Sequence, residues 1–162
     1  MKEILLFLPI AVVYLAVKTT IFPSFPLPDI PLLMVFYLAY TRPSTAVVLF
    51  AFALGFIDDA FSGGIIGATS FALVVIFIAV YLFSKFVQFN TPALKAGGGL
   101  ATAILKGLLT FSVLKFSNLG VHFFSHVLLQ GFVTAVFAPL VIAVFSKVTS
   151  YINPQAFKDS ES

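Results

Sequence analysis

Long apolar runs, separated by short polar or proline-rich breaks, divide this chain into about six segments. A helix that crosses a membrane needs about 20 mostly apolar residues. The expected spans are residues 4–22, 30–40, 45–60, 65–83, 97–115 and 121–148. We therefore predict an all-α integral membrane bundle over residues 1–152, followed by a short polar tail over residues 153–162.

The breaks between the runs contain residues that end helices. The first break contains Pro23, Pro26 and Pro28. Proline lacks the amide donor that an interior helical position needs. Asp29 is suited to start the second span, which is short and is expected to be tilted, partly re-entrant or extended by its flanks. Residues 84–95 form the longest polar stretch between spans. Lys2 and the next apolar run resemble a signal peptide, but no small-residue cleavage site follows, so we expect an uncleaved first span.

The composition indicates a lipid environment. Of the 162 residues, 60% are hydrophobic and only 9% are charged, whereas a soluble domain carries about a quarter charged residues. The mean hydropathy is +1.13. The net charge of +3 comes without a basic patch that interleaves with aromatic residues, so no nucleic-acid partner is predicted. The absence of cysteine excludes disulfides and thiolate metal sites.

The distribution of basic residues predicts the orientation in the membrane. With six spans, both termini lie on one side, together with the second and fourth connections. That side holds six basic residues: Lys2, Arg42, Lys85, Lys95, Lys147 and Lys158. The other side holds Lys18 and Lys115, together with Asp29, Asp58 and Asp59. Because basic residues collect on the cytoplasmic side of membrane proteins, both termini are expected to be cytoplasmic.

The acidic pair Asp58-Asp59 closes the third span and is a candidate functional site, because ionisable groups near the membrane interior are costly. Two structural interpretations compete with that one: each carboxylate lies in headgroup water, or it caps the following turn by accepting backbone amides. Asp59 also lies on a stripe of small residues at intervals of four. The stripe consists of Ala51, Gly55, Asp59, Gly63 and Gly67. Such stripes let membrane helices approach closely, so Asp59 is expected on a packed face.

Lys106 lies near the middle of the fifth span, beside a second run of small residues that begins at Gly99. One interpretation is that its long stem carries the ammonium toward the interface. The other is a buried counter-ion, for which Asp58 or Asp59 is the obvious choice. Such a pair would fix the geometry of the bundle more than it would stabilise it, because desolvation offsets most of the attraction.

The sequence offers no case for an enzyme. His122 and His126 share a helical face, but no glutamate follows His122 and no third ligand is in sight, so neither a metal nor another cofactor is predicted. Nucleophilic catalysis needs a Ser, Cys or Thr with a base and an orienting acid, and no such arrangement is visible.

The segment from Gly55 to Gly67 resembles the signature of MreD, the bacterial rod shape-determining membrane protein. That signature has a glycine, an aspartate four residues later and two further glycines after a short gap. Gly55, Asp59, Gly64 and Gly67 fall on those positions. The early proline-rich break, the short second span and the chain length also fit the family. Asp58, which doubles the acid, and Lys106 depart from the family pattern.

The resemblance implies a non-enzymatic scaffold in the bacterial cytoplasmic membrane. MreD proteins bind MreC and belong to the cell-elongation machinery that contains MreB, RodA and a class B penicillin-binding protein. That machinery maintains rod cell shape and lateral peptidoglycan synthesis. The candidate residues for partner binding or bundle packing are Asp59, Asp58, Gly55, Gly63, Gly64 and Gly67. Of these, Gly55, Asp59, Gly64 and Gly67 are the ones that fall on the family signature.

The helical arrangement of MreD is similar to that of the substrate-binding subunits of energy-coupling-factor vitamin transporters. By this analogy the bundle would have a cavity that opens to the outside and holds a lipid or part of a partner. A transporter subunit is therefore the alternative function, although the chain has few polar residues to line a ligand pocket. A membrane enzyme or lipid carrier is a third hypothesis, and the lack of acid–base groups counts against it.

Overall fold

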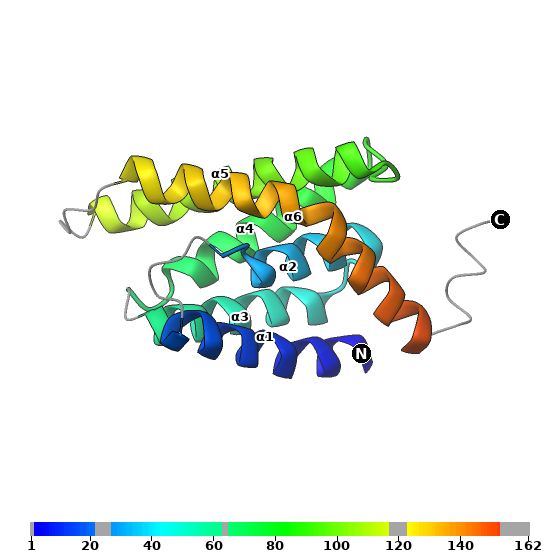
Figure 1. Ribbon diagram of the computed structural model, residues 1–162, viewed down its shortest axis with the longest axis horizontal. Coiled ribbons are helices and arrows are strands. Elements are labelled where there is room, and N and C mark those ends of the chain that lie inside the picture. The colour runs from blue at the N-terminus through cyan, green and yellow to red at the C-terminus, as the bar shows by residue number, and fades with distance from the viewer. Residues whose placement is uncertain (1, 22–26, 63–64, 117–122, 153–162) are drawn as a thin grey trace.

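The computed structural model describes residues 2–21, 27–62, 65–116 and 123–152, with side chains omitted at 2–3, 114–116, 123–128 and 152. Six α-helices form this part of the chain, and successive helices run in opposite directions (Figure 1). They are α1 (Lys2–Ile21), α2 (Ile30–Thr41), α3 (Thr45–Ser62), α4 (Ala68–Ser84), α5 (Pro92–Phe116) and α6 (Phe123–Ile152). The predicted all-α membrane bundle is confirmed. The predicted polar tail, residues 153–162, lies outside the described residues.

The helices fall into two length classes. In the described residues, α1, α3, α5 and α6 are each long and apolar enough to cross a membrane. The other two, α2 and α4, are apolar but have only 12 and 17 residues. Since successive helices run in opposite directions, α1 begins and α6 ends at the same end of the bundle. That end also holds Arg42, Lys85, Lys95 and Lys147, and we call it the basic end.

The short helix α2 is the centre of the bundle. Its nine consecutive residues Pro31–Ala39 are all buried, and it contacts each of the other five described helices. A helix that is apolar on every side is stable only where it is surrounded, so its sequence suits this position. Figure 1 shows α2 between the layer of α1 and α3 and the layer of α5 and α6. Its length is about 18 Å, compared with a hydrocarbon thickness of about 30 Å. The N-terminus of α2 therefore lies inside the membrane.

Helix α5 begins earlier than predicted. The sequence suggested a start near residue 97, but the helix starts at Pro92, within the polar stretch. The hydroxyl of Thr91 accepts a hydrogen bond from the amide of Leu94 (3.3 Å), and proline is favoured in the first turn because it has no amide to leave unpaired there. Capping chemistry therefore outweighed the local polarity at this boundary.

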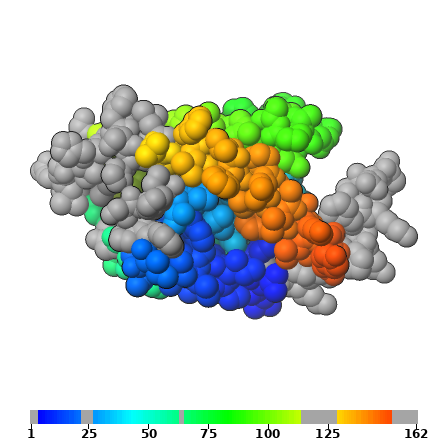
Figure 2. All heavy atoms as spheres, viewed as in Figure 1, coloured from blue at the N-terminus to red at the C-terminus, as the bar shows by residue number. Residues whose placement is uncertain are grey.

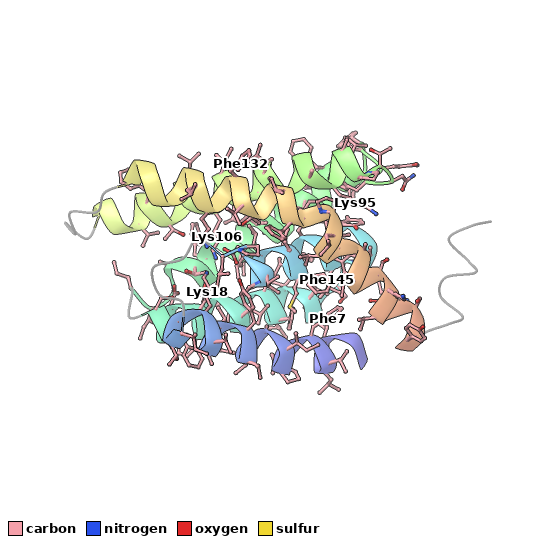
Figure 3. All side chains as sticks on the ribbon, viewed as in Figure 1. Phe7, Lys18, Lys95, Lys106, Phe132 and Phe145 are labelled. Carbon is pink, nitrogen blue, oxygen red and sulfur yellow. The ribbon has the colours of Figure 1, made fainter. Side chains whose placement is uncertain are left out.

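Aromatic rings close the bundle between its first and last helices. The ring of Phe145 on α6 lies 5.3 Å from that of Phe7 on α1 and 5.9 Å from that of Tyr37 on α2, measured between centroids. Figure 3 shows Phe7 and Phe145 facing each other across the two helices. The space-filling view shows α1 and α6 side by side on one face near the basic end (Figure 2). These contacts join α6 to α1 and α2.

Close backbone packing joins α3 to α4 at Gly55. A Cβ atom on Gly55 would lie 2.3 Å from the Cα atom of Ser70, closer than real contacts allow. The hydroxyl of Ser70 donates a hydrogen bond to the carbonyl oxygen of Phe52 (3.1 Å). The small-residue stripe thus packs helices as predicted at Gly55. It does not continue as one helical stripe to Gly67, because α3 ends at Ser62 and Gly67 has a left-handed backbone (φ 101°).

Replacing Gly55 by alanine is expected to lower the free energy of unfolding by about 1 to 3 kcal/mol or more, because α4 must move away from α3. Gly97→Ala is the matched control. A Cβ atom at Gly97 meets nothing within 4 Å, so alanine there is expected to be neutral or to stabilise α5 by up to about 1 kcal/mol. Denaturation in mixed detergent micelles, followed by circular dichroism, measures both. Equal stability of the two variants would contradict the close contact at Gly55.

Candidate functional site

Three ionisable residues, one directly before α2 and one each on α3 and α5, meet at one depth in the bundle. Asp29 precedes α2 and lies about 18 Å from the basic end. Asp58 on α3 and Lys106 on α5 are 13 and 14 residues from the starts of their helices, which places both about 20 Å from that end. Figure 3 shows Lys106 and Lys18 in the half of the molecule opposite Lys95. The depth match follows from helix length alone and brings the charges together inside the membrane.

Lys106 bridges the two carboxylates. Its Nζ atom lies 2.5 Å from Oδ2 of Asp29 and 3.2 Å from Oδ2 of Asp58. The side chains of Lys106, Asp29 and Asp58 are 13%, 5% and 10% exposed. At such low exposure each charged group must be paired with an opposite charge, because an unpaired ion is far more costly in a medium of low dielectric constant than in water. We call these three residues the ion-pair network.

The backbone groups of Asp29 and of the preceding Pro28 connect the ion-pair network to α6 and α1. Its amide donates a hydrogen bond to the hydroxyl of Thr134 on α6 (3.0 Å), and its Oδ1 atom accepts one from the amide of Leu32 (3.2 Å). The hydroxyl of Tyr14 on α1 donates to the carbonyl oxygen of Pro28. The start of α2 is thus held by groups from α1, α5 and α6. This satisfies polar groups that have no water to bind at that depth.

The charges of the ion-pair network are only partly balanced by one another. Two carboxylates face one ammonium, which leaves one negative charge, and the positive charge of Lys18 on α1 also acts on Asp29. The hydroxyl of Ser62 lies 3.4 Å from Oδ1 of Asp58 and donates a hydrogen bond to it. The arrangement couples helices to one another and holds the start of α2 in place.

Asp59 has a different role from Asp58. Its Oδ2 atom accepts a hydrogen bond from the amide of Gly67 (2.8 Å), and both carboxylate oxygens lie 3.1 Å from the amide nitrogen of Thr69. These amides belong to the start of α4, where the helix leaves its first backbone donors without partners. The capping interpretation of Asp59 therefore holds. The headgroup-water interpretation is wrong for both acids, since Asp58 and Asp59 are buried.

The sequence prediction for the Lys106 counter-ion is half right. Asp58 is a partner as predicted, whereas Asp59 is committed to backbone amides. The stronger partner, Asp29, was predicted only to start a helix. A signal was available: the shortness of the second span puts its first residue at the depth of Lys106. The snorkelling interpretation of Lys106 is wrong, because its ammonium binds two buried carboxylates.

Several predicted positions fall outside what the structure describes. Gly63, Gly64 and His122 lie outside the described residues, and so does the side chain of His126. Among the side chains that are described, no three His, Cys, Asp or Glu residues are grouped as a metal site requires. The outward-facing cavity and the role of the site residues in partner binding stay predictions.

Replacing Lys106 by methionine is expected to lower the free energy of unfolding by about 3 to 5 kcal/mol, because two buried carboxylates lose their shared counter-ion. Lys147→Met, at an exposed position of α6, is the control and is expected to change stability by about 0.5 kcal/mol or less. Adding Asp29→Asn and Asp58→Asn to Lys106→Met should recover much of the loss. If Lys106→Met is no less stable than Lys147→Met in detergent unfolding, the ion-pair network does not exist as described.

Replacing Asp59 by alanine is expected to cost about 1 to 3 kcal/mol, because two amides at the start of α4 lose their acceptor. Hydrogen exchange gives a local readout: the amides of Gly67 and Thr69 should exchange much faster in the variant. Thr91→Ala removes the cap of α5 instead and should leave those two amides unchanged. Unaltered exchange in Asp59→Ala would refute the capping role.

Comparisons with known proteins leave the site to be interpreted from its own geometry. The resemblance to MreD extends over essentially the whole chain, but its specific part is the segment from Gly55 to Gly67, which contains the cap and the close helix contact described above. It stays a hypothesis about the family. No protein-family model, no curated protein and no solved structure matches this chain.

Proposed function

We propose that this chain is an MreD-like, non-enzymatic scaffold of the bacterial cytoplasmic membrane that binds an MreC-like protein. The observation that supports this most is the geometry of the segment that resembles the MreD signature. Gly55 permits the contact between α3 and α4, and Asp59 ties the start of α4 to the end of α3. Three of the four residues that carry the resemblance, Gly55, Asp59 and Gly67, thus join α3 to α4. We call this contact the α3–α4 joint.

A joint of this kind suits a scaffold. Its parts are buried backbone contacts and a satisfied carboxylate, which fix how two helices are arranged and leave no group free for chemistry. The ion-pair network has the same character, because Lys106 is bound to both carboxylates and each charged group in it has an opposite charge within 3.2 Å. A protein that presents a fixed surface to other membrane proteins needs such internal order, since association is weakened when the partners must first become ordered.

Through MreC the proposed scaffold would belong to the cell-elongation complex. Its indirect partners would be MreB, RodA and a class B penicillin-binding protein, and its role would be to help maintain rod cell shape and lateral peptidoglycan synthesis. The partner surface is expected on the exposed faces of the bundle. Asp59 would then affect partner binding through the α3–α4 joint, because its own side chain is buried.

A substrate-binding subunit of an energy-coupling-factor-type transporter is the second candidate. One observation favours it: Asp29, Asp58 and Lys106 converge from three helices, and ligand pockets are often built around a few convergent polar groups. Against it, these groups bind each other. In this alternative a vitamin-like ligand would have to replace some of those contacts.

Affinity purification of the tagged full chain from its native membrane in mild detergent, followed by mass spectrometry, tests the proposal. We expect recovery of an MreC-like protein with one membrane span, together with cell-wall synthases. Recovery of a paired ATPase module and its membrane subunit would instead support the transporter alternative and overturn the scaffold proposal.

The variant pair at the α3–α4 joint sharpens this experiment. Gly55→Ala should reduce recovery of the MreC-like protein severalfold at equal amounts of tagged chain, whereas Gly97→Ala should recover it fully. Circular dichroism of the same samples reports how much of each variant remains folded. Full recovery by Gly55→Ala, despite a measured loss of stability, would separate the joint from partner binding and remove the structural support for the proposal.

A further inference from the structure

A pocket lined by hydrocarbon lies between α4 and α5, and a residue of the central helix α2, Phe36, also lines it. Its volume is about 290 Å³, near the lower end of the range for ligand pockets, roughly 300 to 1,000 Å³. Thr102 is the one polar residue of the lining, and its hydroxyl donates a hydrogen bond to the carbonyl oxygen of Gly98 (2.8 Å). The lining therefore suits an apolar occupant.

The pocket is continuous with the lipid-facing surface of the bundle. Its rim is exposed and apolar: Phe83 is 64% exposed, Leu94 is 41% exposed, and Ala101 is also exposed. Its floor is buried and includes Phe36 and Val80. Because α4 and α5 belong to a membrane bundle, hydrocarbon chains of lipid are what meets such exposed apolar residues. The pocket is thus an inward extension of the interface between protein and lipid.

The length of the pocket matches one leaflet of a bilayer. Its lining residues on α5 run from Ala93 to Leu105, which corresponds to about 18 Å along the helix axis. Ala93 lies in the first turn of α5 at the basic end, and Leu105 directly precedes Lys106 of the ion-pair network. One leaflet contributes about 15 Å of hydrocarbon, half of the thickness of the core. The pocket therefore follows the course of a lipid chain in the leaflet at the basic end.

The width of the pocket separates a lipid chain from a protein helix. Its volume and its length give a mean cross-section of about 16 Å². An α-helix with its side chains is about 10 Å wide, which corresponds to a cross-section of about 80 Å². A single extended hydrocarbon chain fits such a narrow space, whereas the helix of a partner or of a second copy does not.

We propose that one acyl chain of a membrane phospholipid occupies the pocket between α4 and α5. The chain enters beside Ala93 and ends beside Leu105, and it contacts Phe36 of the central helix. Its carbon atoms complete the packing of α2, α4 and α5, because an unfilled space would forfeit the dispersion contacts of its walls. Recognition lies in the hydrocarbon lining and does not require a particular headgroup. This inference does not depend on the identity of the protein partner.

Tryptophan fluorescence tests the occupant, because the chain has no tryptophan of its own. Phe36→Trp places a reporter in the pocket floor. Phe7→Trp places one at an equally buried position that does not line the pocket, since both phenylalanines are 0% exposed. Each full-length variant is reconstituted in dioleoylphosphatidylcholine and in phosphatidylcholine brominated on its acyl chains. Bromine quenches tryptophan only over short distances, so we expect severalfold stronger quenching of Phe36→Trp. Equal quenching of the two reporters would overturn the proposal.

A second reporter and a dilution series complete this experiment. Leu105→Trp lies at the inner end of the pocket and reports in the same way if Phe36→Trp does not fold, which circular dichroism shows. Lowering the ratio of protein to lipid should leave the quenching of either reporter unchanged. Quenching that rises on dilution would mean that a second copy of the chain had occupied the pocket, and it would refute the proposal.

Leucine substitutions test where the acyl chain lies. In the Phe36→Trp background, Ala101→Leu fills the pocket and should reduce quenching severalfold. Ala143→Leu makes the same change at an exposed position of α6 outside the pocket and should leave quenching unchanged. Circular dichroism confirms that each variant is folded. If the two leucine variants are quenched equally, the acyl chain does not occupy this pocket and the proposal fails.

Discussion

The shortness of α2 is the constraint on which the rest of the bundle depends. A central helix of 12 residues spans about 18 Å and must therefore begin inside the membrane. The first turn of α2 has backbone amides without helical partners, and Asp29 directly precedes it. Neither an unpaired amide nor an unpaired carboxylate is tolerated in hydrocarbon. Lys106, Thr134 and Tyr14 supply groups that hold this point. The neighbouring helices are thereby fixed around the start of α2.

Two kinds of contact hold the helices, and they have different physical origins. The ion-pair network has little net stabilising effect, because desolvation offsets most of the attraction, but it penalises any arrangement in which Lys106 and the two acids separate. The α3–α4 joint works through close packing at Gly55 and the cap from Asp59. In lipid, where apolar side chains gain little by leaving the solvent, such contacts decide which helix faces meet.

The two ends of the bundle differ in how their charges are used. Toward the end opposite the termini, the acids are buried and bind Lys106 or backbone amides. At the basic end, Lys85 and Lys95 have no acid in the adjoining sequence. The acids and Lys106 fix the internal structure. Because basic residues collect on the cytoplasmic side of membrane proteins, this asymmetry predicts that the basic end faces the cytoplasm.

The sequence alone determined the all-α membrane class, the six segments, the short second helix and the packed face of Asp59, because apolar run length and small-residue spacing are local properties. It also singled out Lys106 as a residue in need of a counter-ion. Only the tertiary structure decided that Asp29 and Asp58, rather than Asp59, provide it. The depths of these residues follow from the helix lengths, but which way each side chain faces depends on how α2, α3 and α5 pack, and no spacing along one helix encodes that.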